Sequence, residues 1–179
     1  SFGRAIRTFT DYVPGPDMGL NEGLMAQLRD SCGRAVGLPS VLGGIPLDEL
    51  GATGFGLAVA ADVAAERGIL DLQGARLVVQ GFGAVGSHAA RFLSERGAVL
   101  VAVSDSQGAV VNPDGLDVVS LVAHKAAGQS VAEFPGGERV DPETLIALDC
   151  DVWVPAARPD VFTAENADQL RASLLLQGA

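Results

Sequence analysis

The residues best suited to chemistry lie in the segment Gly81–Gly86, which follows the apolar, β-branched run Arg76–Gln80. Its sequence, GFGAVG, fits the pattern GxGxxG between a predicted strand and a predicted helix. In this setting the first glycine allows a tight turn, the second lets the backbone approach a pyrophosphate, and the third allows close packing of helix on strand. The N-terminus of the helix would face the anion. We therefore expect a dinucleotide to bind the backbone of Gly81, Phe82, Gly83, Ala84, Val85 and Gly86.

A carboxylate, Asp105, follows a second apolar run, Ala98–Ser104, about 20 residues beyond Gly86. At that position it can accept hydrogen bonds from the adenosine ribose and would repel a 2′-phosphate, which favours NAD over NADP as the cofactor. Ser106 would belong to the same subsite. The alternative is that Asp105 only begins a turn that ends at Gly108.

A second carboxylate, Asp17, lies in the loop Tyr12–Gly19, whose backbone Pro14 and Pro16 restrict. A carboxylate on such a loop can act as a general acid and base once its surroundings tune its pKa. The alternative is a loop aspartate that bonds to neighbouring backbone amides. The residues alone leave both interpretations open.

Strands and helices alternate along most of the chain. This pattern predicts an α/β fold with a Rossmann-type, doubly wound, mostly parallel sheet and helices on both faces. The expected strands are 76–80, 98–104, 151–155 and 173–177, and the expected helices are 21–33, 53–68, 87–96, 116–127, 141–148 and 163–170.

The glycine- and proline-containing stretch 37–46 reads as an irregular linker. We therefore expect residues 1–40 to be the remnant of another domain with its linker, and residues 41–179 to be the dinucleotide-binding domain.

Composition limits the classes of partner that the chain is expected to bind. The 179 residues are 48% hydrophobic with a formal charge of −10, which disfavours nucleic acids and anionic membranes. No apolar run reaches the roughly 18 residues of a membrane span.

Cys32 and Cys150 match no metal or redox spacing, so a reduced, cytoplasmic setting is expected. His88 and His124 lack ligand partners at metal-binding spacing, and no metal site is predicted.

Several segments together resemble a known family. They are YVPGPDMG at 12–19, LGGIPLDELGATGFG at 42–56, VVQGFGAVGSHAARFL at 78–93, VAVSDSQG at 101–108, NPDGLD at 112–117 and CDVWVPAA at 150–157. In this order they resemble the glutamate, leucine, phenylalanine and valine dehydrogenases, and the glutamate dehydrogenases most of all. The resemblance implies oxidative deamination of an amino acid, L-glutamate in the nearest case, to a 2-oxo acid and ammonia, with hydride transfer to NAD or NADP.

The resemblance also implies roles for individual residues. Asp17 matches the catalytic aspartate that moves protons to and from the reacting nitrogen. Thr53 matches a residue that holds the nicotinamide carboxamide, although it could equally be a helix cap. Ala156 and Ala157 match a loop whose backbone passes the nicotinamide ribose.

The chain lacks a residue on which the family's catalysis depends. The family's catalytic lysine has no counterpart, because the single lysine, Lys125, lies on a predicted helix elsewhere. The stretch 158–160 also differs from the sequence that usually follows the alanine pair in the family. Because the chain starts at Ser1 and stops where the family continues, we expect a fragment truncated at its C-terminal end and inactive alone.

The resemblance implies a homo-oligomeric parent, a hexamer, while the fragment is expected to be a monomer or weak dimer. Two alternatives stay open for the function. One is a leucine, phenylalanine or valine dehydrogenase, and the other is a non-catalytic NAD-binding module.

Overall fold

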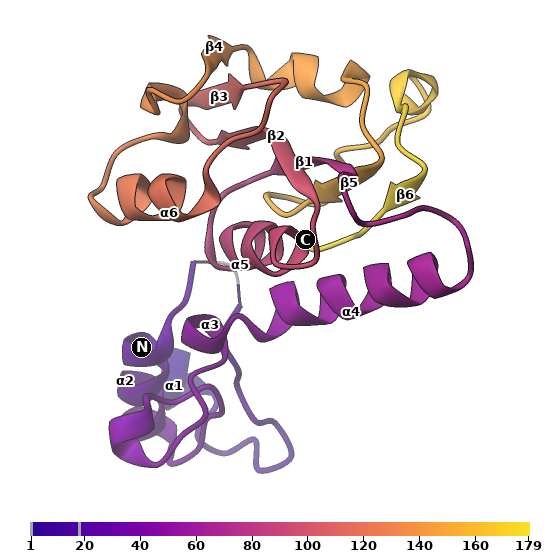
Figure 1. Cartoon of the computed structure of the whole chain (residues 1–179). Coiled ribbons are helices and arrows are strands. Elements are labelled where there is room, and N and C mark those ends of the chain that lie inside the picture. Colours follow the sequence, from indigo (N-terminus) through magenta and orange to yellow (C-terminus); the bar gives the residue numbers. More distant parts are fainter. Residues whose placement is uncertain (1, 18) are drawn as a thin grey trace. The chain divides into compact units, whose positions relative to one another are not determined.

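The computed structural model describes residues 2–17 and 19–179, and its secondary structure is drawn in Figure 1. The chain separates into two compact units, Ser1–Ala52 and Thr53–Ala179. The division expected after residue 40 concerned the domains of a longer protein, and it stays a prediction.

The second unit is built on one six-stranded sheet with the order β4-β3-β2-β1-β5-β6. The neighbours β1–β2, β1–β5 and β5–β6 are parallel, whereas β2–β3 and β3–β4 are antiparallel. The expected α/β, Rossmann-type sheet is therefore confirmed, with an antiparallel extension at one edge. The strands are β1 (Arg76–Gln80), β2 (Val99–Asp105), β3 (Gly108–Val111), β4 (Glu138–Val140), β5 (Val152–Pro155) and β6 (Leu174–Leu175).

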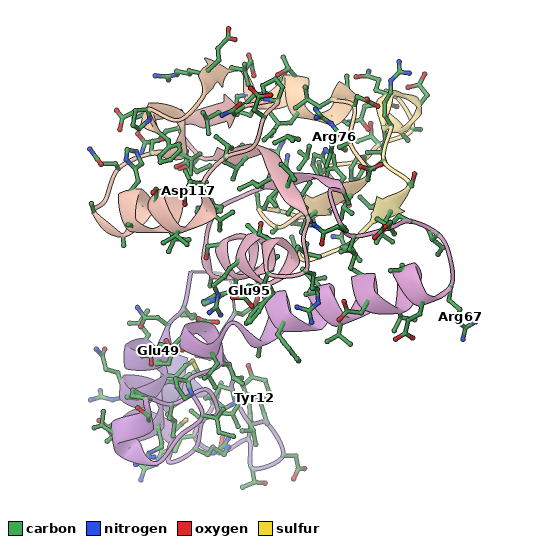
Figure 2. The ribbon with its side chains drawn as sticks, viewed as in Figure 1. Tyr12, Glu49, Arg67, Arg76, Glu95 and Asp117 are labelled. Atoms are coloured by element: carbon green, nitrogen blue, oxygen red, sulfur yellow. The ribbon has the colours of Figure 1, made fainter. Side chains whose placement is uncertain are left out.

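Three α-helices lie on one face of this sheet: α4 (Ala52–Glu66), α5 (Ala84–Ser94) and α6 (Val118–Ala126) (Figure 1). Asp117 starts α6, and its side chain accepts a hydrogen bond from the Ser120 N–H at 3.0 Å (Figure 2). The core on this face is formed by alternate strand residues and by small helix residues, including Ala58, Ala61, Leu77, Val79, Ala89, Leu93, Val152 and Val154.

The opposite face is covered by 3-10 turns where α-helices were expected. The turn η3 (Pro142–Ala147) replaces the helix predicted over 141–148, and η4 (Ala167–Gln169) replaces the one predicted over 163–170. Trp153 fills the core of this face, because it is 1% exposed and its Nε1 donates to the Leu145 carbonyl at 3.2 Å. Its ring packs edge-to-face on Phe162.

The first unit contains α1 (Phe2–Ala5), α2 (Glu22–Cys32), the 3-10 turn η1 (Ser40–Leu42) and α3 (Leu47–Leu50). Asn21 caps α2 by accepting from the Leu24 N–H, and Gly33 ends it in the left-handed conformation. The buried Glu22 connects α2 to α3, because its Oε1 accepts from the N–H groups of Asp48 at 3.0 Å and Glu49 at 3.3 Å.

Candidate functional site

Two glycines of the Gly81–Gly86 segment are required by close backbone packing. Gly81 has φ of +90°, and a Cβ there would lie 2.8 Å from the backbone of Ala156. A Cβ on Gly86 would lie 1.8 Å from the Gly81 carbonyl oxygen. No side chain fits at either position, so the tight turn and the close helix contact expected from the sequence are both present.

The middle glycine, Gly83, has a different environment. It is exposed, it starts α5 without any side-chain hydrogen bond to cap the helix, and a Cβ there would meet nothing within 4 Å. The first N–H groups of an α-helix have no partner within the helix, and they carry a partial positive charge. The start of α5 is therefore open for an anion to approach backbone donors. Phe82 can contribute only backbone, because its side chain is 2% exposed in the core.

This loop lies where the ends of three strands meet. The Gly81 N–H donates to the Ser104 carbonyl on β2 at 3.0 Å, and the Ala156 N–H, just after β5, donates to the Gln80 carbonyl at 2.7 Å. The chain passes from β1 to β2 on one side, while β5 pairs with β1 on the other. The carboxyl ends of β1 and β5 thus form a topological switch point, the usual place for a ligand in such a sheet.

The structure therefore brings Ala156 and Ala157 next to Gly81. A Cβ on Gly81 would also lie 2.8 Å from the Ala157 Cα. Ala156 is half-buried and Ala157 is exposed, so their backbone borders the open side of the glycine turn.

Asp105 ends β2, beside this loop, and both of its carboxylate oxygens have partners within the protein. Oδ1 accepts from the Gln107 N–H and the Ser130 hydroxyl, each at 2.9 Å. Oδ2 accepts from Lys125 Nζ at 2.5 Å and from the Val131 N–H at 3.0 Å. The side chain is 5% exposed. The bond to Gln107 is the turn interaction that the sequence offered as the alternative role, while Ser106 is exposed.

These partners hold Asp105 ionised. Burial alone raises the pKa of this carboxyl, but the Lys125 ammonium and the hydrogen bonds from Gln107, Val131 and Ser130 outweigh it and lower the pKa to about 2. Sequence reasoning placed Lys125 away from the site. Its position seven residues after Val118, in the last turn of α6, gave no local signal that it would reach the end of β2.

The two remaining predicted site residues are Thr53, on α4, and Asp17, in the first unit. Thr53 lies inside the first turn of α4, so the helix-cap alternative is wrong. The adjacent Gly54 packs on the middle of α5, where a Cβ would lie 2.6 Å from the Ala89 nitrogen. Asp17 is exposed in the first unit, and its carbonyl accepts from the Leu20 N–H at 2.8 Å. The functional roles of both residues stay predictions.

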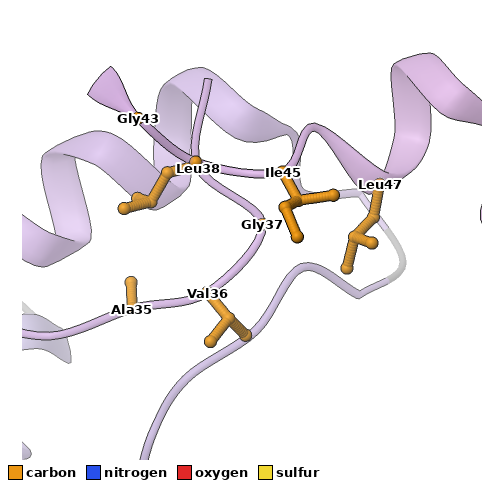
Figure 3. A pocket seen from close by; sticks show the side chains of 8 residues that line it. Ala35, Val36, Gly37, Leu38, Gly43, Ile45 and Leu47 are labelled. Carbon is orange, nitrogen blue, oxygen red and sulfur yellow. The ribbon is translucent and has the colours of Figure 1, made fainter. Parts of the chain in front are cut away.

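The first unit also has an apolar hollow of about 350 Å³ (Figure 3). No charged or hydroxyl side chain lines it, so it offers shape but no catalytic group. Its lining residues are Ala35, Val36, Gly37, Leu38, Gly43, Gly44, Ile45 and Leu47.

No metal centre emerges in residues 2–17 and 19–179. Nowhere in these ranges do three His, Cys, Asp or Glu side chains group so that they could hold an ion. Burial and the neighbouring Asp151 and Asp149 raise the pKa of the Cys150 thiol to about 11, which keeps it protonated. In the same ranges, every helix is too short or too polar to cross a membrane.

The sequence profile of the Glutamate/Leucine/Phenylalanine/Valine dehydrogenase family matches residues 43–179. The chain belongs to this family. The match includes the glycine loop, Asp105 and the Ala156–Ala157 segment.

Individual family members agree with this assignment. The chain is 38% identical over 176 residues to the NADP-specific glutamate dehydrogenase of Saccharolobus shibatae, which covers 93% of this chain and 41% of that protein. It is 40% identical over 178 residues to the glutamate dehydrogenase of Thermotoga maritima, with 93% and 42% covered.

A solved structure is similar over nearly the whole chain. The hetero-hexameric glutamate dehydrogenase of Thermus thermophilus, in its leucine-bound form, superposes with a TM-score of 0.78 at 32% identity. This match covers 98% of the present chain and 46% of that one. The chain thus spans less than half the length of these family members.

Proposed function

We propose that this chain is the NAD(P)-binding part of an amino-acid dehydrogenase of the glutamate type. The proposed reaction is oxidative deamination of L-glutamate to 2-oxoglutarate and ammonia. The observation that carries the proposal is the open N-terminus of α5, held by Gly81 and Gly86 at the switch point between β1 and β5. Membership of the dehydrogenase family agrees with it.

The residues present fit a dinucleotide. Its pyrophosphate would accept from backbone N–H groups at the start of α5, where the bare Gly83 leaves room. The backbone of Ala156 and Ala157 would pass the nicotinamide ribose, and Thr53 would hold the carboxamide. When bound, the nicotinamide supplies the acceptor for hydride.

For the adenosine end, NAD is the proposed cofactor and NADP the alternative. Asp105 and Ser106 would lie beside the ribose. Lys125 offsets the charge of Asp105, so the repulsion of a 2′-phosphate should be weaker than an isolated carboxylate would give. We therefore expect NAD and NADP affinities to differ less than the sequence alone suggested.

Asp17 is proposed to exchange a proton with the substrate nitrogen. Because the chain lacks a counterpart of the family's catalytic lysine, we propose that activity requires a longer protein, which assembles as a homo-oligomer. A cytoplasmic location belongs to the same proposal, since both cysteines are buried and unpaired.

The substrate is tested by a kinetic screen of the full-length protein with glutamate, leucine, valine and phenylalanine, using each cofactor. Turnover of glutamate with the highest kcat/KM is expected. Preference for a branched or aromatic amino acid would assign the chain to another branch of the family. Cofactor binding without turnover of any of them would favour a non-catalytic binding module.

A further inference from the structure

Arg34 makes an unusual set of contacts within the first unit. Its Nε donates to the Tyr12 carbonyl at 2.6 Å, and one Nη donates to the Ile6 carbonyl at 2.8 Å and to that of Phe9. The other Nη donates to the carbonyls of Arg7 at 3.3 Å and of Cys32 at 3.2 Å. One guanidinium therefore binds four backbone carbonyls of the segment 6–12.

The residues after Arg34 contact the part of the chain that follows residue 12. The Val36 N–H donates to the Pro14 carbonyl at 2.9 Å, and Pro14 is buried. Gly37, with φ of +66°, faces the Pro16 ring so closely that a Cβ would lie 2.5 Å from the ring Cδ. Residues 34–37 thus contact residues 12–16, which directly precede Asp17.

We infer that Arg34 is the positioning residue of the Asp17 loop, and this inference rests on the proposed role of Asp17. Two prolines stiffen the loop internally, but they do not fix where it lies. Its position is set by the hydrogen bonds that Arg34 donates to backbone carbonyls of residues 6–12. The hydrogen bond from the Val36 N–H to the Pro14 carbonyl also contributes. An arginine is required because its planar fork offers five N–H donors, whereas a lysine offers three from one point.

The structural part is tested on the 179-residue chain by amide hydrogen exchange. The reporters are the N–H groups of Tyr12 and Val36, which bond to the Phe9 and Pro14 carbonyls. Arg34→Ala should speed their exchange by roughly tenfold to a hundredfold, the loss expected for hydrogen bonds to a charged group. Arg4→Ala is the matched control, because Arg4 is exposed in the same unit and should leave both rates unchanged.

Arg34→Lys keeps the charge and some donors, so it should give intermediate rates. This variant decides the question if the alanine variant unfolds the first unit. Unchanged exchange at Tyr12 and Val36 in Arg34→Lys and in a folded Arg34→Ala would overturn the inference.

The functional part is tested in the full-length enzyme. Arg34→Ala should lower kcat by roughly tenfold to a hundredfold, the cost of a misplaced catalytic group, and leave the KM for the cofactor unchanged. Millimolar guanidinium should restore part of the lost kcat in Arg34→Ala but none in Asp17→Asn. If Arg34 only stabilised the fold, Arg34→Ala would change both kcat and the KM for the cofactor, or guanidinium would restore no activity.

The catalytic role of Asp17 and the positioning role of Arg34 can be refuted separately. Full activity of Asp17→Asn would remove the catalytic role of Asp17, while the exchange rates would still show whether Arg34 holds the loop. An inactive Asp17→Asn beside a fully active Arg34→Ala would overturn the inference about Arg34 alone.

Discussion

The cluster around Asp105 should make the stability of the chain depend on pH in a defined range. The pKa of Asp105 is lowered from 3.8 to about 2, with burial opposing the shift and Lys125 giving the largest lowering contribution. A carboxyl with a lowered folded-state pKa stabilises the protein above its unfolded pKa. That contribution is lost as the pH falls from about 4 to about 2. At 1.36 kcal/mol per pKa unit, it amounts to about 2 kcal/mol at neutral pH.

The assay is urea unfolding of the chain and of Asp105→Asn at pH 6, 4, 3 and 2.5, followed by circular dichroism. The asparagine cannot ionise, so the difference in unfolding free energy between the two proteins should be about 1.5 kcal/mol larger at pH 6 than at pH 2.5. Asp168→Asn, an exposed carboxyl on η4, serves as the control and should show little pH-dependent difference. A constant difference between the chain and Asp105→Asn at all four pH values would refute the reasoning.

Three further substitutions test the packing of the helices and the sheet. Gly86→Ala should destabilise the chain by about 1 to 3 kcal/mol, because its Cβ would overlap the Gly81 carbonyl. Gly56→Ala, with open space on α4, should stabilise it by up to about 1 kcal/mol; equal urea midpoints for both variants would contradict this. Trp153→Phe should cost about 1 kcal/mol in thermal unfolding, since it removes the hydrogen bond to Leu145; an unchanged Tm would contradict that bond's contribution.

The strand, glycine loop and helix from Arg76 to Ser94 could be predicted from the sequence because their signals are local. An apolar run, three spaced glycines and an amphipathic helix lie within 20 residues or so of one another, at the spacing that the dinucleotide fold uses. The predicted strand boundaries at Arg76 and Gln80 match β1. The family resemblance favoured the predicted catalytic role of Asp17, which the residues alone left open, and added the predicted role of Thr53.

The antiparallel edge was missed because short strands carry little pattern of their own. β3 and β4 have four and three residues, and they are defined by pairing with β2 and with each other. The helix predicted from Thr163 failed for a local reason. The Asn166 side chain accepts from the Thr163 N–H and donates to the Val161 carbonyl, so it competes with the helical hydrogen bonds.

The partners of Asp105 could not be predicted from spacing. Lys125, Ser130 and Val131 reach it only because α6 packs beside the sheet and returns the chain to the end of β2. The sequence therefore located the carboxylate at the expected position but missed the charge that accompanies it. This difference matters most for the choice between NAD and NADP.

If the open N-terminus of α5 binds a dinucleotide, a side chain at Gly83 should weaken that binding. Its φ of −90° suits any residue, and a Cβ there would meet nothing within 4 Å, so Gly83→Val should fold normally while it fills the space above the helix start. Calorimetric titration with NADH and NADPH should show binding to the chain and to Gly56→Ala, and at least about tenfold weaker binding to Gly83→Val. Equal affinity of Gly83→Val, or no binding of either cofactor to the unmodified chain, would contradict the claim.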